Sequence, residues 1–224
     1  MRQSPVRAMI LEKVPQLVHR RIILASASPR RQELLKQIGL KYEVIVSSFE
    51  EDLPKDTVTG SAYAELTATH KALDVAQNMK EPAYLIISAD TVVECQGHIL
   101  EKPADSADAK RMLDMLNGSS HQVHTGVALA TPVTSSEDGA IEWAVHSFVE
   151  TTTVTFDNLS SGEIDAYVAS GEPFGKAGSY GIQGKAAPFV QSINGCYFNV
   201  VGLPLHRLSK ELNTLIDSGT LKLM

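Results

Sequence analysis

The second half of the chain holds two long, neighbouring stretches whose composition and length are typical of strands. They cover residues 121–133 and 141–156, and the polar stretch at 134–140 joins them like a long hairpin. In the first half, shorter strand and helix patterns alternate. A chain that alternates early and then continues in long antiparallel strands predicts a mixed α/β fold.

The other elements follow from hydrophobic periodicity and turn residues. Helices are predicted at 29–38, 61–79, 106–116, 160–171 and 203–217. Strands are predicted at 21–25, 41–47 and 83–95, with a hairpin turn at 96–97 into 98–102. Two more strands are predicted at 189–193 and 197–202, on either side of the turn pair at 194–195.

We expect a single domain at 21–217, with an extension at 1–20 and a tail at 218–224. The first 21 residues hold five lysines and arginines against one glutamate. That excess weakly resembles a transit segment. Our interpretation is a ragged or docked N-terminal extension.

The segment SASPRR, residues 26–31, places two arginines where a predicted helix begins. Ser28 is a typical N-cap, and Pro29 is typical of the first helical position. Arg30 and Arg31 would then lie at the positive end of the helix dipole, where cations are disfavoured. An anion bound at the same helix start reverses that effect, and guanidinium groups suit phosphate oxygens. We therefore interpret the segment as an anion site; two solvated arginines are the alternative.

Asp90 ends the most apolar run of the chain, AYLIISAD at 83–90. A carboxylate there is poorly placed for packing, and ligands collect at strand ends in open α/β sheets. A hydrogen-bonded turn residue beside Thr91 is the alternative. Glu51, in the loop after the second predicted strand, is the natural partner carboxylate. Two carboxylates together with phosphate oxygens and waters commonly hold Mg²⁺.

Three further residues have settings that suit an anionic ligand. Lys71 lies on the face of a predicted helix, and Lys102 follows a predicted strand. Gln183 lies in the glycine-rich stretch 174–188, where backbone can approach a ligand closely. Each signal is weak alone, because lone lysines are mostly solvated and glycine-rich loops have many uses.

Charge, apolar runs and cysteines limit the classes of partner. Net charge is −6, from 26 acidic and 20 basic residues, which argues against nucleic-acid binding by general attraction. No apolar run reaches the roughly 18 residues that cross a bilayer. Cys95 and Cys196 form no CxxC pair and are interpreted as thiols of a reducing compartment, which predicts a cytoplasmic location.

Histidine spacing and signature motifs exclude further classes. His121 and His124 are three apart on a predicted strand, so they face opposite sides and do not form a metal site. The chain lacks GxSxG, GxxxxGK[ST] and GxGxxG. Serine-hydrolase, Walker-type and Rossmann assignments therefore lose their main support.

Six segments, in their order along the chain, resemble the Maf family of septum-formation-inhibitor-like nucleotide pyrophosphatases. They are LASASPRRQELL, ISADTVV, LEKP, HQVHTGVAL, GEPFGKAGSYGIQG and NGCYFNVVGLPL, within residues 21–215. The resemblance implies an elongated mixed sheet flanked by helices, with two lobes and a central cleft, related to inosine triphosphate pyrophosphatase. It also implies a homodimeric hydrolase that converts nucleoside triphosphates to monophosphate and pyrophosphate with Mg²⁺ or Mn²⁺.

The resemblance also implies roles, residue by residue. The phosphate-binding positions are matched by Ser26, Arg30, Arg31, Lys71 and Lys102, and the loop glutamine by Gln183. Glu51 matches an acid near the metal, and Asp90 matches an aspartate that acts as base or metal ligand. We accordingly expect Asp90, Glu51 and Lys102 to act in catalysis, and Glu51 and Asp90 to bind the metal.

Within the family, PRR, ADT and YGIQG resemble the branch that acts on dTTP and UTP rather than on 7-methyl-GTP. The chain departs from the family pattern at His70, where glutamate is frequent, and at Gly175, where aspartate is frequent. Two alternatives stay open. One is the same reaction on modified nucleotides, such as methylated pyrimidines or 7-methyl-GTP. The other is a regulator that binds nucleotides without hydrolysis, although the presence of both Glu51 and Asp90 favours an enzyme.

Overall fold

The computed structural model describes residues 10–51, 53–55, 57–134 and 141–223. Within them the strands are β1 (Ile22–Leu24), β2 (Glu43–Val44), β3 (Leu85–Cys95), β4 (His98–Leu100), β5 (Ser120–Thr134), β6 (Ile141–Phe156) and β7 (Val190–Asn194). The helices are α1 (Val14–Leu17), α2 (Pro29–Gln37), α3 (Gly60–Asn78), α4 (Ser106–Leu116), α5 (Ser161–Ala169), α6 (Tyr197–Val201) and α7 (Leu205–Asp217). Short 3₁₀ turns are η1 (Ile10–Glu12), η2 (Ala177–Ser179) and η3 (Ala187–Phe189).

Within the described residues the strands form one mixed sheet, in the order β2-β1-β3-β5-β6-β7, with β4 paired to β3. The first three strands of this order are parallel, and the pairs from β3 to β7 are antiparallel. Strands β5 and β6 stay in register from Ser120↔Thr155 to Thr134↔Ile141. The mixed α/β fold with long antiparallel strands is thereby confirmed. The predicted connection at 134–140 lies, apart from Thr134, outside the described residues.

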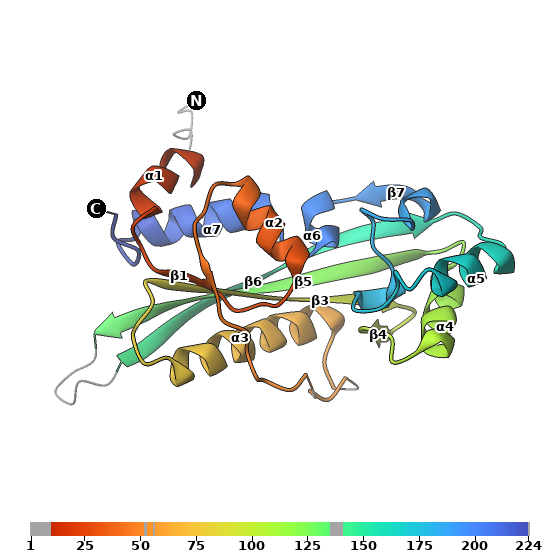
Figure 1. The fold of residues 1–224 in the computed structure, drawn as a ribbon, viewed down its shortest axis with the longest axis horizontal. Coiled ribbons are helices and arrows are strands. Elements are labelled where there is room, and N and C mark those ends of the chain that lie inside the picture. The colour runs from red at the N-terminus through yellow and green to blue at the C-terminus, as the bar shows by residue number, and fades with distance from the viewer. Residues whose placement is uncertain (1–9, 52, 56, 135–140, 224) are drawn as a thin grey trace, which may run out of the picture.

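Helices cover both faces of the sheet (Figure 1). Helix α3 crosses β3, β5 and β6 on one face, while α2, α6 and α7 lie on the other. Small residues let α3 approach closely: a Cβ at Gly126 of β5 would lie 2.2 Å from the carbonyl oxygen of Ala64. The long strands continue beyond these helices to α4, α5 and β7, so the molecule is elongated, with helices gathered toward both ends (Figure 1).

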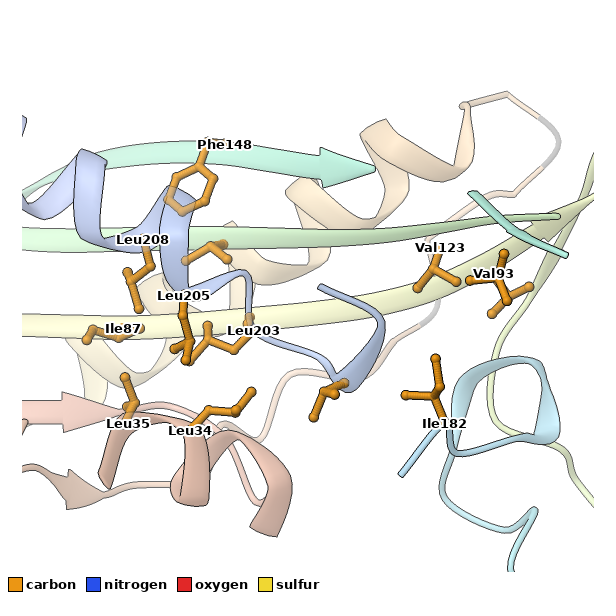
Figure 2. Close-up of a cluster of buried hydrophobic side chains, with 14 of the residues drawn as sticks. Leu34, Leu35, Ile87, Val93, Val123, Phe148, Ile182, Leu203, Leu205 and Leu208 are labelled. Atoms are coloured by element: carbon orange, nitrogen blue, oxygen red, sulfur yellow. The ribbon is translucent and has the colours of Figure 1, made fainter. Parts of the chain in front are cut away.

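The larger part of the core lies between the sheet and the helices opposite α3. Figure 2 shows Leu34 and Leu35 of α2 and Leu208 of α7 close to Ile87 of β3. The same cluster reaches Ile182 in the glycine-rich segment (Figure 2). One continuous apolar layer therefore connects the first helix after β1 with the loop that follows α5, and it fixes both relative to β3.

Helix boundaries agree with the capping residues in the sequence. The side chain of Ser28 accepts a backbone N–H bond at the start of α2, and Gly39 (φ +80°) follows the end of that helix. Side chains of Thr59, Asp105 and Ser160 cap α3, α4 and α5 in the same way. These bonds satisfy donors that helix starts leave open, which is why the boundaries could be predicted.

The predicted strand at 197–202 is wrong, because residues Tyr197–Val201 form α6. Strand β7 pairs with β6 instead of with a hairpin partner, and Gly195 (φ +131°) turns the chain away. The helical turn places the side chain of Asn199 in the core, where its Nδ2 donates to Val123 O and Thr152 Oγ1 at 2.9 and 3.0 Å. Those buried hydrogen bonds favour a helix here over the predicted strand, which would have formed a hairpin with β7.

Two further findings concern the N-terminal part. The predicted strand at 41–47 is reduced to Glu43–Val44, because its partner β1 offers only three residues. Residues 10–20 of the predicted extension are docked on α7: the Ile10 N–H donates to Ser209 Oγ at 3.2 Å, and Lys13 pairs with Asp217 at 2.7 Å. Residues 1–9 of that extension lie outside the described residues.

Candidate functional site

The site lies where the sheet has a gap. Strand β1 ends with Leu24 opposite Ile87 of β3, whereas β4 pairs with β3 only from Val93 onward. Residues 88–92 of β3 therefore lack a strand neighbour on that side within the described part of the chain. A cleft of about 710 Å³ opens there, and Asp90 lies at the middle of the gap. The sequence suggested that Asp90 lies at the end of its own strand. In the structure β3 continues past Asp90 to Cys95, and it is the neighbouring strand β1 that ends.

All eight residues that the sequence singles out line this cleft. They are Ser26, Arg30, Arg31, Glu51, Lys71, Asp90, Lys102 and Gln183. They come from the segment after β1, from α2, the loop after β2, α3, β3, the segment after β4 and the glycine-rich segment. Seven separate parts of the chain thus supply one cavity.

Two carboxylates and two lysines form a continuous cluster in the cleft. Lys71 Nζ donates to Glu51 Oε1 at 2.7 Å and to Asp90 Oδ1 at 2.8 Å. Lys102 Nζ donates to Glu51 Oε1 at 3.2 Å. Side chains alternate along β3, so Asp90 projects toward α3, the helix that carries Lys71. The carboxylate pair predicted from the sequence is therefore joined through one shared ammonium group.

The pKa values of the two carboxylates in this cluster are shifted in opposite directions. Asp90 is only 5% exposed, and its burial raises its pKa despite the opposing charges of Lys71 and Arg31. Burial alone would also raise the pKa of Glu51, but the ammonium groups of Lys71 and Lys102 outweigh it and hold that pKa below its usual range. Carboxylates separated in this way typically divide roles, with the raised one suited to take a proton.

Arg31 is held in the cleft by neutral oxygens. Its guanidinium donates to Gly202 O at 2.8 Å, Ser26 Oγ at 3.1 Å and Thr91 Oγ1 at 2.9 Å. Burial lowers the pKa of Arg31, while the charge of Asp90 favours its charged form. The bonded oxygens carry no formal charge. The guanidinium is consequently fixed in place with its positive charge uncompensated by any direct ion pair among the described residues.

Arg30, the neighbour of Arg31, belongs to a different part of the cleft. Burial lowers the pKa of Arg30, against a smaller opposing effect of Tyr167 on α5. The charges that act on Arg31 are those of Asp90 and Glu51 as well as Arg30. Both arginines line the same cleft, but the charges of the two carboxylates act on Arg31 and not on Arg30.

The glycine-rich segment that carries Gln183 is anchored at three points. The side chains of Tyr180 and His121 are hydrogen-bonded at 2.8 Å between Oη and Nε2. The Gly181 N–H donates to Tyr167 Oη at 3.2 Å, and the Lys185 N–H donates to both carboxylate oxygens of Glu172 at 2.9 and 3.0 Å. These bonds fix the backbone on both sides of Gln183 against the cleft.

The histidine that anchors this segment gives the fold an acid-sensitive group. His121 is 2% exposed, and burial lowers its pKa to about 4. An unfolded chain binds a proton at this imidazole near pH 6.5, whereas the folded one does not until about pH 4. Stability is therefore lost as pH falls from about 6.5 to about 4, by on the order of 3 kcal/mol in total.

We expect His121→Gln to flatten this pH dependence, because the amide does not titrate. The free energy of unfolding, measured in urea at pH 7 and pH 5, should fall less for the variant than for the wild type. His98→Gln is the matched control, since His98 is exposed on β4. Equal pH dependence of wild type and His121→Gln would show that His121 is not the group responsible.

Two threonines that hold Arg31 from behind, Thr91 and Thr125, were not among the predicted site residues. Thr91 Oγ1 lies 3.0 Å from Thr125 Oγ1, and Thr125 Oγ1 donates to Asn199 O at 3.0 Å. This chain links the guanidinium to α6, the helix that was predicted as a strand. Uncharged hydroxyls on strands give no sequence signal of their own, and only the position of Thr91 directly after Asp90 could have suggested a role.

Among the described residues, no three His, Cys, Asp or Glu side chains gather closely enough to hold a metal ion by themselves. Two of the acidic residues that line the cleft, Glu51 and Asp90, share a lysine. Within the described chain, no helix is long and apolar enough to span a membrane.

Comparisons with known proteins give matches over most of the chain. A family model described as Maf-like protein matches residues 21–215. The dTTP/UTP pyrophosphatase of Bacillus thuringiensis subsp. konkukian (strain 97-27) is 48% identical over 193 residues, which are 86% of this chain and 94% of that protein. The dTTP/UTP pyrophosphatase of Bacillus cereus (strain AH820) is 47% identical over the same length.

Two other matches are partial or distant. A protein of Homo sapiens named as a probable bifunctional dTTP/UTP pyrophosphatase/methyltransferase is 46% identical over 204 residues. The match covers 89% of this chain and 32% of the human protein, so the chain spans about a third of that relative's length. The solved structure of the Staphylococcus aureus Ham1 protein matches 89% of this chain and 99% of its own, with a TM-score of 0.44 and 15% sequence identity.

Proposed function

The chain belongs to the Maf-like protein family, and from that premise we propose that it is a nucleoside triphosphate pyrophosphatase acting on dTTP and UTP. The reaction breaks the bond between the α-phosphorus and the oxygen that bridges to the β-phosphorus. Water adds at the α-phosphorus, and the products are the nucleoside monophosphate, pyrophosphate and a proton. The observation that carries this proposal is one cleft that holds four cations together with the acid pair Asp90 and Glu51.

The cations of the cleft neutralise the triphosphate. Negative charge builds on the leaving pyrophosphate as the bond breaks, and fixed cations that meet it lower the barrier. Arg31 is the most rigid of them, because three hydrogen bonds fix its guanidinium before any ligand binds. Arg30, Lys71 and Lys102 complete the set, and Ser26 orients Arg31 through its hydroxyl.

Asp90 is proposed as the group that accepts the proton of the attacking water. Its raised pKa makes it a stronger base than an exposed carboxylate, while Lys71 keeps it oriented at 2.8 Å. Glu51 stays ionised because its pKa is lowered by two ammonium groups that outweigh the effect of burial. Glu51 therefore suits charge binding, and Asp90 suits proton transfer.

The donor set also fits a divalent cation. Mg²⁺ in phosphate-transfer sites is held by one or two carboxylates together with substrate phosphates and waters. Glu51 and Asp90 can supply the carboxylates. A bound Mg²⁺ or Mn²⁺ would polarise the α-phosphate and lower the pKa of a bound water.

Base selection is proposed to come from the glycine-rich segment. Gln183 offers an amide with both donor and acceptor atoms, which can pair with the edge of uracil or thymine. Its backbone is held on both sides by Tyr167 and Glu172. A rigid hydrogen-bonding site rejects bases that leave its polar atoms unpaired.

A substrate panel tests the function. Purified protein with Mg²⁺ is expected to release pyrophosphate fastest from dTTP or UTP, compared with CTP, dATP, GTP, a methylated pyrimidine triphosphate and 7-methyl-GTP. Chelation of the metal by EDTA should abolish release. Fastest turnover of a methylated pyrimidine or of 7-methyl-GTP would overturn the substrate assignment. Calorimetric binding of dTTP without any turnover would indicate a nucleotide-binding regulator instead.

The family resemblance further leads us to propose a homodimer in the cytoplasm, with residues 21–217 as the catalytic domain. Cys95 and Cys196 are both free thiols, which agrees with a reducing compartment. Helix α7 ends at Asp217, which agrees with the proposed end of the domain. Gel filtration with light scattering would test the oligomeric state.

A further inference from the structure

A fifth cation, Lys176, lines the cleft beside the four that the sequence singles out. It lies directly before η2, in the glycine-rich segment, and lines the same cavity as Asp90. We propose that Lys176, together with Arg30, binds the β- and γ-phosphates of the substrate, the part that leaves as pyrophosphate. This inference rests on the proposed function and adds a residue and an orientation of the substrate to it.

Lys176 is positioned by its surroundings rather than freely solvated. Its Nζ donates to the backbone carbonyl of Glu172. Its stem packs against the backbone of Gly181 so closely that a Cβ there would lie 2.8 Å from Lys176 Cε. A larger residue at position 181 would require the end of the lysine stem to shift. The ammonium group is thus held at the cleft by a neutral oxygen, as Arg31 is on the other side.

The carboxylate nearest in sequence to Lys176 is already engaged. Both oxygens of Glu172 accept the backbone N–H of Lys185, and Oε1 also accepts from Tyr167 Oη at 3.2 Å. Within the described residues, Lys176 has no ion pair with any carboxylate, and neither has Arg30. By contrast, Lys71 and Lys102 are both paired with acids.

Two unpaired cations in one partly buried cleft disfavour each other. Burial lowers the pKa of Lys176, and the positive charge of Arg30 lowers it further, against a smaller opposing effect of Glu172. Burial also lowers the pKa of Arg30. An anion between the two groups reverses this cost, because each cation then gains an opposite charge in a medium of low dielectric.

The charge distribution also gives the substrate a direction. The α-phosphate has to reach Asp90, which supplies the base, and the acids there already pair with Lys71 and Lys102. Arg31 donates to Thr91, the neighbour of Asp90, whereas Lys176 lies in the glycine-rich segment, where the charge of Arg30 lowers its pKa. A polyphosphate that begins at Asp90 therefore extends past Arg31 toward Arg30 and Lys176, where positive charge is unpaired. A neutral base would gain little from that pair.

Lys176→Met tests the proposal, because methionine keeps most of the stem and removes the charge. Lys185→Met is the matched control: Lys185 is exposed on the same segment and does not line the cleft. Inorganic tripolyphosphate and dTMP serve as probes, with dissociation constants measured by calorimetry. Thermal unfolding of both variants shows whether each is folded.

Lys176→Met is expected to weaken tripolyphosphate binding about tenfold or more, the usual effect of one charge-assisted hydrogen bond. Binding of dTMP should change less than twofold, Lys185→Met should match the wild type, and Lys176→Arg should restore most of the affinity. Unchanged tripolyphosphate binding in a folded Lys176→Met variant would overturn the proposal, as would an equal loss for dTMP. Because these assays measure binding alone, they stay informative even if dTTP and UTP are not hydrolysed.

Discussion

Asp90→Asn is expected to lower kcat for dTTP by at least about a hundredfold, the usual scale for loss of a general base. The amide can still accept the hydrogen bond from Lys71 Nζ, so the cluster geometry is kept while the proton acceptor is lost. Binding of dTTP, measured by calorimetry, should change little. The amide should also not lower the melting temperature, because burial disfavours the charged form of Asp90 in the folded protein.

The pH profile gives a second measurement on the same variant. Since the pKa of Asp90 is raised, its base form is lost at a higher pH than that of an exposed aspartate. As the pH is lowered, the kcat/KM of the wild type should therefore begin to fall at a pH above the usual pKa range of aspartate. Asp90→Asn should not show this fall. Asp114→Asn, on the exposed face of α4, is the control. A variant that retains wild-type kcat would show that another group accepts the proton.

Arg31→Met is expected to reduce kcat/KM by about a hundredfold to a thousandfold, the scale for removal of one fixed donor to a developing negative charge. The substitution removes the cation and leaves Ser26 Oγ and Thr91 Oγ1 without their guanidinium partner. Both KM and kcat should be affected, because the guanidinium meets the bound triphosphate and also the charge that develops on the leaving group.

Arg31→Lys separates charge from geometry. A single ammonium cannot bond three separate oxygens in the plane that the guanidinium spans, so we expect only partial recovery. Arg111→Met is the control, because Arg111 pairs with Asp108 on the exposed face of α4 and such pairs contribute little. Full activity of Arg31→Lys would mean that charge alone is needed and that the bonds to Thr91 and Gly202 are structural.

Much of the fold could be predicted because local signals and tertiary packing agree. Ser28 and Ser160 mark helix starts, because their side chains accept hydrogen bonds from nearby backbone N–H groups. Gly39 marks a helix end, because it adopts a positive φ. The segment around Asn199 is different. Its helical form depends on bonds to Val123 and Thr152, which lie more than 40 residues away, and its apolar composition suits a strand equally well.

The candidate site likewise contains residues that the sequence could predict and residues that only the folded chain identifies. Arg31 and Asp90 are noticeable in sequence because each is a charged residue at a position that packing alone does not favour. Thr125 and Lys176 are ordinary in sequence, and only the folded chain places one behind Arg31 and the other beside Arg30. The shared hydrogen bonding of Lys71 to both carboxylates likewise depends on the approach of α3 to β3.

The alternation of side chains along β3 has a consequence for how this enzyme can vary. Asp90 and Thr91 are adjacent, yet one bonds to Lys71 on α3 and the other to Arg31 on α2, on opposite sides of the sheet. The proposed proton acceptor, Asp90, and the residue that holds the phosphate-binding Arg31, Thr91, are therefore separated by a single peptide unit of β3. Insertions in the surrounding loops can reshape which nucleotide enters without altering that spacing, whereas a single-residue shift within β3 would exchange the two sides at once.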